Sequence, residues 1–272
     1  RGLGDVYKRQ MYSLKKVFDK DKAPYDLLKG IRSPKLDGTA ISLLYEDGYL
    51  VQALRRGRDG LEGEDVTDKM YHLVPRRSYN YGVFQIDGEV VCDKTINNAR
   101  NYASGAFGLK DIDEFKTRVP HLQFVAYGVR PALTETYTAD MASLHSEGFA
   151  TVLGKNIAEN YRTDGEVYRE ESNLLYEKAG YTSKHPRGAY ARKQSSEVET
   201  KETLLLDVIW QVGRTGKVSP VAIFEQITID DANINRATLH NPGFIEEMDL
   251  DIGDTIIVTR SGGIIPKVLG KV

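Results

Sequence analysis

The stretch Lys35-Leu36-Asp37-Gly38-Thr39-Ala40-Ile41-Ser42-Leu43-Leu44-Tyr45 joins a lysine and an acid–glycine pair to an alternating apolar segment. Alternation of this kind predicts a β-strand with one buried face. A lysine at the edge of such a strand can attack phosphorus and carry a nucleotide as a phosphoramidate. The motif alone is short, and a lysine near an aspartate is usually a solvated ion pair. Its meaning therefore depends on the segments that follow it.

Five further segments follow in order along the chain. They are Arg55-Arg56-Gly57-Arg58-Asp59-Gly60-Leu61-Glu62-Gly63-Glu64-Asp65-Val66-Thr67, Asp87-Gly88-Glu89-Val90-Val91, Asn98-Ala99-Arg100-Asn101-Tyr102-Ala103-Ser104-Gly105, Asp164-Gly165-Glu166-Val167 and Arg187-Gly188-Ala189-Tyr190-Ala191-Arg192-Lys193. This series resembles the nucleotidyltransferase motifs of DNA ligases. Three segments are similar to those of the NAD-dependent DNA ligases in particular: Gly63-Glu64-Asp65-Val66-Thr67, Val212-Gly213-Arg214-Thr215-Gly216 and Ala237-Thr238-Leu239-His240-Asn241. The resemblance extends from Met11 to Val272.

The composition is that of a soluble enzyme. The 272 residues are enough for two domains with separate cores. No apolar run approaches the ~20 residues that span a bilayer, and no secretory signal is visible, so we expect a cytoplasmic protein without a membrane partner. The single cysteine, Cys92, excludes a disulfide framework. A net charge of -2 is no global sign of nucleic-acid binding, although basic residues can still gather on one face.

The chain divides into three parts. Residues 1–10 show no apolar period, and we interpret them as a non-native leader outside the fold. The resemblance places an adenylation domain at residues 11–200 and an OB-fold domain at 203–272. Family members also carry a domain that binds nicotinamide mononucleotide (NMN) before this region, and a zinc finger and helix-hairpin-helix domain after it. We expect the full protein to contain these further domains.

Periodicity and turn residues predict the elements. A hairpin is expected over residues 39–56, and further strands at 84–92, 122–128, 165–169 and 189–194. Helices are expected at 95–104, 111–118 and 138–146. The second domain should contain strands at 204–212, 217–224, 227–234, 255–259 and 264–269 and a helix at 242–248. The fold class is therefore an α+β nucleotidyltransferase domain with antiparallel sheets, followed by an all-β OB-fold barrel.

The resemblance implies roles in phosphoryl transfer for a small set of residues. Lys35 matches the nucleophile, and because a free lysine amine is protonated at neutral pH, it needs nearby cations and partial desolvation to attack phosphorus. Glu89 and Asp164 match the two carboxylates that hold the ribose and a Mg²⁺ ion, although an acid taken alone is more often a surface residue. The catalytic set implied by the motifs is Lys35, Asp37, Arg56, Glu89, Asp164 and Lys193.

The resemblance also implies how NAD is bound. Tyr127 matches the aromatic residue that stacks on adenine, and Val167 matches the apolar residue on the other face of the base. Read without the family, Tyr127 is as well explained as a half-buried core residue. The expected nucleotide-binding set is Ser13, Leu14, Lys35, Arg56, Glu89, Tyr127, Val167, Arg169 and Lys193.

Four positions depart from the family pattern. Ser33 stands where the family usually has a glutamate that reads the adenine amino group. Arg169 replaces a lysine, Gly108 replaces an arginine, and Arg58 is an insertion. An arginine is not equivalent to a lysine where a compact ammonium group is required.

Six residues match family positions that contact nicked duplex DNA: Arg100, Asn101, Arg214, Arg260, Ile264 and Ile265. Arg187 is a further candidate because it belongs to a basic cluster. The alternative for basic clusters is a solvated surface, and for Ile264 and Ile265 it is barrel core. Since neighbouring strand residues point to opposite faces, at most one of the two isoleucines can point into the barrel.

The sequence therefore predicts a fragment of an NAD-dependent DNA ligase. It would act as a monomer, with NAD as AMP donor and Mg²⁺, and would seal nicks through a lysyl-AMP intermediate and an adenylated 5′-phosphate. Two alternatives stay open. Asp87-Gly88-Glu89 also resembles a motif of ATP-dependent DNA ligases and RNA ligases, and a fragment without the NMN-binding domain could bind nicks without turnover.

Overall fold

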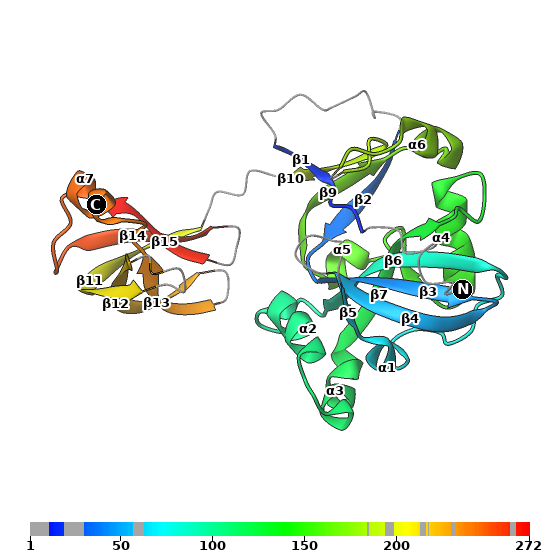
Figure 1. The fold of residues 1–272 in the computed structure, drawn as a ribbon, viewed down its shortest axis with the longest axis horizontal. Helices are drawn as coiled ribbons and strands as arrows, with labels where there is room; N and C mark the ends of the chain where they lie inside the picture. Colours follow the sequence, from blue (N-terminus) through cyan, green and yellow to red (C-terminus); the bar gives the residue numbers. More distant parts are fainter. Residues whose placement is uncertain are drawn as a thin grey trace. The chain divides into compact units, whose positions relative to one another are not determined.

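The computed structural model describes residues 11–18, 30–56, 63–183, 185–193, 199–212, 216, 218–229, 232–261 and 265–272. The chain forms two compact units that divide between residues 194 and 195. Each unit buries an apolar cluster of its own. Figure 1 labels the helices and strands of both units. The predicted domain boundaries lie near this division and stay a prediction.

A six-stranded sheet is the centre of the first unit. Its strands are ordered β5-β4-β3-β6-β7-β8, and all pairs are antiparallel except β7 with β8. The bounds are β3 Thr39–Glu46, β4 Tyr49–Arg56, β5 Gly63–Asp65, β6 Val83–Cys92, β7 Leu122–Arg130 and β8 Ala150–Thr151. The predicted hairpin is thus confirmed. The alternation decides its buried face, because Ile41, Leu43 and Tyr45 are fully buried.

A second sheet of four strands carries the lysine of the opening stretch. Its order is β1-β10-β9-β2, with β1 Lys15–Phe18, β10 Ala189–Lys193, β9 Thr163–Arg169 and β2 Ile31–Leu36. The sequence predicted β9 and β10 but not the two outer strands. Both β1 and β2 are short and rich in charged or polar residues, so their periodicity carries no signal.

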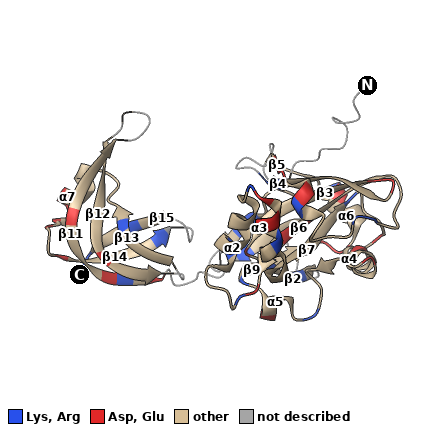
Figure 2. Ribbon diagram, turned by 90° about the horizontal axis from the view of Figure 1, so that it is seen from below, with Lys and Arg blue, Asp and Glu red and all other residues tan. Residues whose placement is uncertain are grey.

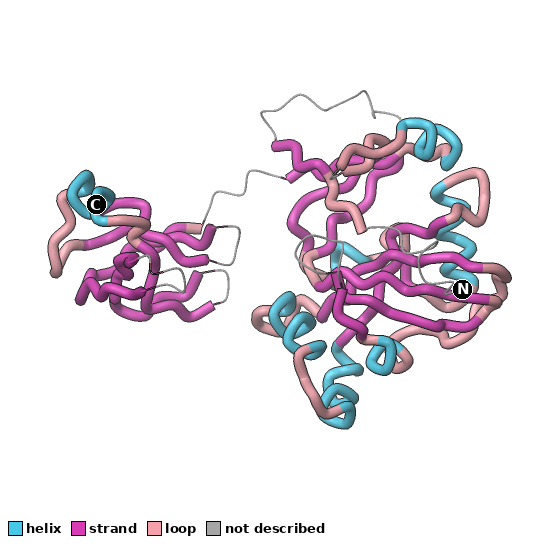
Figure 3. The backbone as a smooth tube through the Cα atoms, viewed as in Figure 1, coloured by secondary structure: helices cyan, strands magenta, loops and turns pink. Residues whose placement is uncertain are grey.

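The helices of the first unit are short and flank the strands (Figure 3). They are α1 Thr67–Met70, α2 Ala99–Phe107, α3 Ile112–Arg118, a 3₁₀ turn Val119–His121, α4 Tyr137–Ser146, α5 Ile157–Asn160 and α6 Asn173–Ala179. The helix predicted at 95–104 begins later, at Ala99. The reason is local, because Asp93 accepts the backbone N–H of Thr95 at 2.8 Å in a turn and Asn98 has a φ of 54°.

The second unit is a closed five-stranded barrel with the order β11-β12-β13-β15-β14. The bounds are β11 Thr200–Val212, β12 Val218–Ile229, β13 Ala232–Thr238, β14 Thr255–Ser261 and β15 Ile265–Lys271, with α7 at Pro242–Met248. The strand predicted at 227–234 is wrong. Instead β12 continues to Ile229 through a register shift between Ile223 and Ile227, which breaks the apolar alternation without ending the strand.

Within the described ranges, no helix is both long and apolar enough to cross a lipid bilayer.

Candidate active site

The acid–glycine pair after Lys35 is held between two neighbouring elements. The backbone N–H of Asp37 donates to the carbonyl oxygen of Arg162 at 3.0 Å. A Cβ atom at position 38 would lie only 2.2 Å from the carbonyl oxygen of Val90, so the chain can pass β6 only with glycine there. The motif therefore specifies a close backbone contact, next to the lysine that the resemblance predicts to be the nucleophile.

The lysine amine meets one of the two predicted carboxylates directly. Lys35 Nζ donates to Asp164 Oδ1 at 2.7 Å, and both side chains are about three-quarters buried, at 26% and 27% exposure. Antiparallel pairing of β2 with β9 brings these residues together, although 129 positions separate them. The short distance and partial burial make this contact stronger than a surface ion pair.

Glu89 is the second carboxylate beside the lysine. It lies in β6, paired with Ala40 of β3, and it accepts the backbone N–H of Gly38. Burial raises the pKa of Glu89 to about 7, against the opposing effects of the Lys35 ammonium and that N–H. Gly88 before it is also required, because a Cβ there would meet the Phe124 ring at 2.2 Å.

Asp37 and Arg100 form an ion pair next to this group. Arg100 Nη1 lies 3.2 Å from Asp37 Oδ1, and more than two-fifths of the Arg100 side chain is exposed. Asn101 beside it is exposed, and its amide nitrogen lies 3.4 Å from the Asn98 side-chain oxygen. The first turn of α2 thus brings one predicted DNA-binding residue into contact with the site.

Ser13, near the start of the described chain, contacts two residues that are distant in sequence. Arg56, at the end of β4, donates to the hydroxyl of Ser13. His185 Nδ1 donates to the carbonyl oxygen of Ser13 at 2.7 Å, and Leu14 is half-buried. These contacts group three of the predicted nucleotide-binding residues. Lys193 ends β10 opposite residue 18, and its side chain lies outside the described part of the structure, as does the insertion at Arg58.

The two residues predicted to enclose adenine come from different sheets. Tyr127 in β7 is half-buried, and burial followed by the charges of Asp87 and Glu89 raises its pKa well above the ordinary value. Val167 in β9 is half-buried and pairs with Ser33 of β2 and Ala191 of β10. The structure therefore places Tyr127 within the electrostatic reach of Glu89 and Val167 on the sheet of Lys35.

Arg169 does not extend toward Lys35. Its guanidinium lies between the rings of Tyr137 and Tyr176, 4.1 and 4.2 Å from their centroids, and donates to Asn173 at 3.2 Å. It stands at the opposite end of β2, paired with Ile31. Its predicted nucleotide contact stays a prediction, and the observed role is to hold α4 and α6 against β9.

Sequence reasoning missed a charged pair whose two members both influence Tyr127 electrostatically. Arg130 of β7 pairs with Asp87 of β6, and Gln85 donates to the same carboxylate at 2.8 Å. All three belong to the antiparallel β6–β7 pair, and a motif that contains only Asp87 gives no sign of its partner. The buried pair fixes the strand that presents Glu89.

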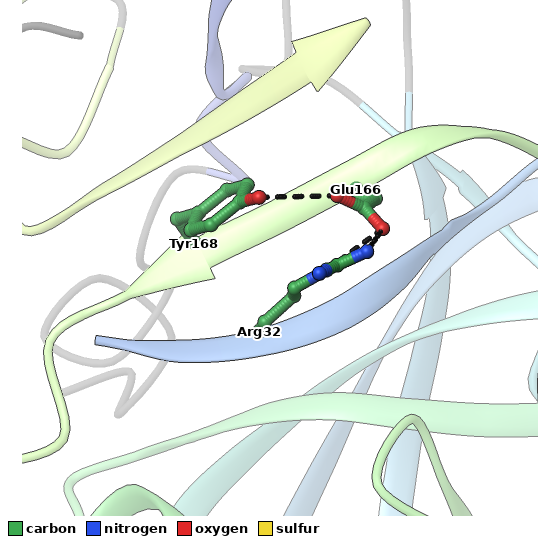
Figure 4. Close-up of polar contacts among 3 residues, drawn as sticks. All are labelled: Arg32, Glu166 and Tyr168. Atoms are coloured by element: carbon green, nitrogen blue, oxygen red, sulfur yellow. Dashed lines mark hydrogen bonds and ion pairs between the residues drawn. The ribbon is translucent and has the colours of Figure 1, made fainter. Parts of the chain in front are cut away.

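A second group missed by sequence reasoning links β2 to β9 on the sheet that carries Lys35. Arg32 donates twice to Glu166 Oε1, with its Nε at 2.7 Å, and Tyr168 donates to Glu166 Oε2 at 3.1 Å (Figure 4). The Tyr168 ring also stacks on Tyr190 of β10, with centroids 5.1 Å apart. The alternation of each strand puts these residues on one face and Ser33 and Val167 on the other.

The remaining predicted DNA-binding residues lie in different surroundings. Arg187 is exposed. Arg260 is buried in the barrel and donates from Nη1 to the Ile229 carbonyl at 3.2 Å, so its predicted DNA contact would require it to leave this position. Ile265 is 61% exposed, consistent with an outward role for one of the isoleucines. Arg214 and Ile264 lie outside the described residues.

Cations are also carried by the barrel strands. β13 and β15 contain Arg236, Lys267 and Lys271 (Figure 2, blue). Lys271 forms ion pairs with Asp249 and Asp254. The described ranges contain no group of three or more His, Cys, Asp or Glu side chains suited to a metal ion.

Two family models match this chain. The model of the NAD-dependent DNA ligase adenylation domain matches residues 6–159, and that of the NAD-dependent DNA ligase OB-fold domain matches residues 202–272. The chain belongs to the NAD-dependent DNA ligases. The first match begins inside the segment interpreted as a leader, and that interpretation stays a prediction.

Individual relatives agree with this family. A DNA ligase of Helicobacter pylori strain G27 is 34% identical over 308 residues, which cover 96% of this chain and 46% of that protein. A DNA ligase of Thermomicrobium roseum is 33% identical over 89% of this chain and 41% of its own length. The chain thus spans about half the length of the curated relatives it matches.

A solved structure from a study of DNA binding by Lig E DNA ligases shares the fold of this ligase chain. The TM-score is 0.52 at 13% identity, and the match covers 92% of this chain and 94% of that one. At this identity the likeness concerns the fold alone. It agrees with an adenylation domain followed by an OB-fold barrel.

Proposed function

We propose that this chain is the part of an NAD-dependent DNA ligase that seals nicks in duplex DNA through a lysyl-AMP intermediate. One observation carries the proposal. The Lys35 amine donates to the Asp164 carboxylate at 2.7 Å, and Glu89 lies beside it in an adenylation domain of this family. An amine next to carboxylates on a rigid pair of strands is arranged for nucleophilic catalysis.

The first step follows from this arrangement. The Lys35 nitrogen forms a bond to the α-phosphorus of NAD, the phosphorus–oxygen bond to nicotinamide mononucleotide breaks, and that product leaves. Before attack the ammonium group has to lose a proton, and Asp164 Oδ1 at 2.7 Å is within reach to accept it. Tyr127, Val167 and Ser13 are proposed to hold the adenosine half of NAD.

The later steps use the same groups on DNA. The AMP passes from Lys35 to the 5′-phosphate of a nick, and the 3′-hydroxyl then displaces AMP to form the phosphodiester bond. Arg100, Asn101, Arg187 and the barrel residues Arg214, Arg260, Ile264 and Ile265 are proposed to hold the nicked duplex. Exposed arginines such as Arg187 suit phosphate contacts, which position the duplex without reading its sequence.

A Mg²⁺ ion fits the donor set at this site. Glu89 and Asp164 supply hard oxygen ligands, and both lie next to Lys35. Magnesium is usually held by one or two carboxylates together with substrate phosphates, so two protein carboxylates are sufficient. When bound, the ion would neutralise charge on the transferred phosphate. We further propose that the protein acts as a monomer in the cytoplasm.

The test separates the steps. Purified chain is incubated with a nicked duplex whose 5′-phosphate is already adenylated, and the products are resolved on a denaturing gel. Wild-type chain and Lys35→Ala should both seal it, because the nucleophile has acted before this step, whereas Glu89→Ala should lose sealing. Sealing by Glu89→Ala at the level of the wild-type chain would show that Glu89 takes no part in this step.

A second measurement identifies the AMP donor. The protein is treated with NAD or ATP in the presence of Mg²⁺, and the peptide that contains Lys35 is weighed by mass spectrometry. We expect one adenylyl group from NAD when the NMN-binding domain of a related ligase is present, little without that domain, and none in Lys35→Ala. Because adenylation from NAD requires the nicotinamide half to be positioned as leaving group, the NMN-binding domain of a related ligase is added in trans in a parallel reaction. An adduct from ATP alone would instead indicate an ATP-dependent ligase.

A further inference from the structure

A loop of unusual composition lies beside the six-stranded sheet, at the end of β3 that is remote from Glu89. It is Pro75-Arg76-Arg77-Ser78-Tyr79-Asn80-Tyr81-Gly82, with two arginines, two tyrosines and no acidic residue. It lies beside the β3–β4 turn, whereas Glu89 pairs near the opposite end of β3, at Ala40. The length of β3 separates the two places by about 23 Å, at about 3.3 Å per residue. The loop is therefore not part of the active site.

The loop has a fixed backbone. Ser78 N donates to the carbonyl of Gly48 at 2.9 Å, and Leu50 N donates to that of Arg76 at 3.1 Å. The Glu147 carboxylate accepts the Tyr79 N–H at 3.3 Å and the Asn80 side chain. Hydrogen bonds to two neighbouring elements hold the loop, so its shape is formed before any partner arrives.

Two aromatic rings on this fixed loop face water almost completely. Tyr79 is 86% exposed and Tyr81 is 87% exposed, and Tyr49 on β4 beside them is 52% exposed. An aromatic ring contributes most to the free energy of binding when a partner covers it. Tyrosines exposed to this degree on an ordered backbone are typical of binding surfaces. Neither Tyr79 nor Tyr81 packs against the described apolar core of this unit.

The charges of the same loop are positive and available. Arg77 lies over the Tyr49 ring at 4.9 Å and Arg76 over the Tyr71 ring at 4.6 Å, and both arginines are exposed. Stacking of this kind leaves the edges of the guanidinium groups free to donate hydrogen bonds. Two carboxylates that contact the loop, Asp47 and Glu147, accept hydrogen bonds from the backbone N–H groups of Gly82 and Tyr79. The surface thus offers cations and open rings together.

We propose that residues 75–82 together with Tyr49 form a second nucleic-acid surface, which binds an unpaired strand. Tyr79 and Tyr81 would stack on bases, and Arg76 and Arg77 would contact phosphates, the combination that single strands use. A duplex fits less well because its bases are already stacked in pairs. An acidic protein segment could use the arginines but would leave the two open rings without a partner. The surface does not depend on the chemistry at Lys35.

The test measures binding of fluorescein-labelled oligothymidylate, which forms no secondary structure, by fluorescence anisotropy. The double variant Tyr79→Ala/Tyr81→Ala should bind at least about tenfold more weakly, because base stacking on an aromatic side chain is strong enough for such a loss. The variant Arg76→Ala/Arg77→Ala should also flatten the log–log salt dependence by about 0.7 for each phosphate that it no longer binds. The matched control is Lys116→Ala/Lys178→Ala, two exposed lysines outside the loop.

The outcomes decide between partners. An equal loss of affinity for oligothymidylate in the control variant would show that binding depends on general surface charge, and would overturn the proposal. A preference for intact, nick-free duplex that depends on Arg76 and Arg77 but not on the tyrosines would replace it with a duplex contact. Competition by polyglutamate as effective as that by unlabelled oligothymidylate would replace it with an acidic protein partner. Sealing of a pre-adenylated nick is measured for every variant, and we expect it to be unchanged.

Discussion

At the scale of single residues, the two glycines of the site have a geometric role. Gly38 and Gly88 each lie where a Cβ would come within 2.2 Å of a neighbouring atom, the first of a backbone oxygen and the second of the Phe124 ring. A backbone oxygen cannot move aside as a flexible side chain can. Gly38 therefore determines how closely the Lys35 segment approaches β6, and with it the distance from Lys35 to Glu89.

Gly38→Ala should consequently be among the most damaging substitutions in the site. We expect a loss of at least about 3 kcal/mol in the free energy of unfolding, the upper part of the range for overpacking, since the clash is with backbone. Urea denaturation measures it. Gly128→Ala is the control, because a Cβ there has no atom within 4 Å. Similar losses in the two variants would contradict the close approach.

Glu89 makes stability depend on pH. Its pKa is raised from 4.5 to about 7 in the folded chain, so between these values the folded state binds more protons than the unfolded state. Stability should therefore fall as the pH rises through this window, by at most about 3 kcal/mol in metal-free buffer, from about 1.4 kcal/mol per unit. Glu89→Gln should remove this part of the slope. The measurement is the free energy of unfolding at about pH 4 and about pH 8, and an identical slope in the variant would exclude Glu89 as its source.

At the scale of elements, α2 is positioned from its C-terminal end. Lys69, from α1, donates to the carbonyl oxygens of Phe107 at 2.5 Å and Leu109 at 2.7 Å, where helical carbonyls lack partners. The other end of the same helix carries Arg100, which pairs with Asp37. A lysine outside every motif thus contributes to the placement of a site residue.

Lys69→Ala should cost about 2 kcal/mol in stability, the range for hydrogen bonds to a charged donor. Lys116→Ala is the matched control. It removes an exposed pair with Asp113 three residues away in α3, and it should cost about 0.5 kcal/mol or less. Thermal unfolding of the two variants compares them directly. A smaller loss for Lys69→Ala than for the control would show that α2 does not need this cap.

At the scale of the whole molecule, stability is divided between two large cores, one in each unit. One cluster includes Ile41, Leu43 and Phe124, and the other includes Leu205, Ile256 and Val258, with no residue in common. Because each cluster lies entirely within one compact unit, we expect each unit to be able to fold by itself. Substitutions in one core should leave the other intact.

Ile41→Ala and Ile256→Ala test this division, because both side chains are fully buried. Each should lose about 2–5 kcal/mol of stability in its own unit only. Limited proteolysis followed by mass spectrometry would show which unit is cleaved first. The expected result is earlier cleavage after residue 194 for Ile256→Ala and before it for Ile41→Ala. Simultaneous cleavage of both units in each variant would indicate one cooperative molecule.

The sequence by itself determined the local features of this protein. The hairpin over 39–56 and the strands β6, β7, β9 and β10 follow from spacing and turn residues, because these depend on neighbours along the chain, whereas the ligase segments were recognised by their resemblance to a family. Only the tertiary structure decided which distant residues meet. The Lys35–Asp164 contact, the enclosure of Arg169 by two tyrosines and the burial of Arg260 join segments far apart in sequence. Periodicity carries no information on such pairs, since strand order and register are set by how whole sheets pack.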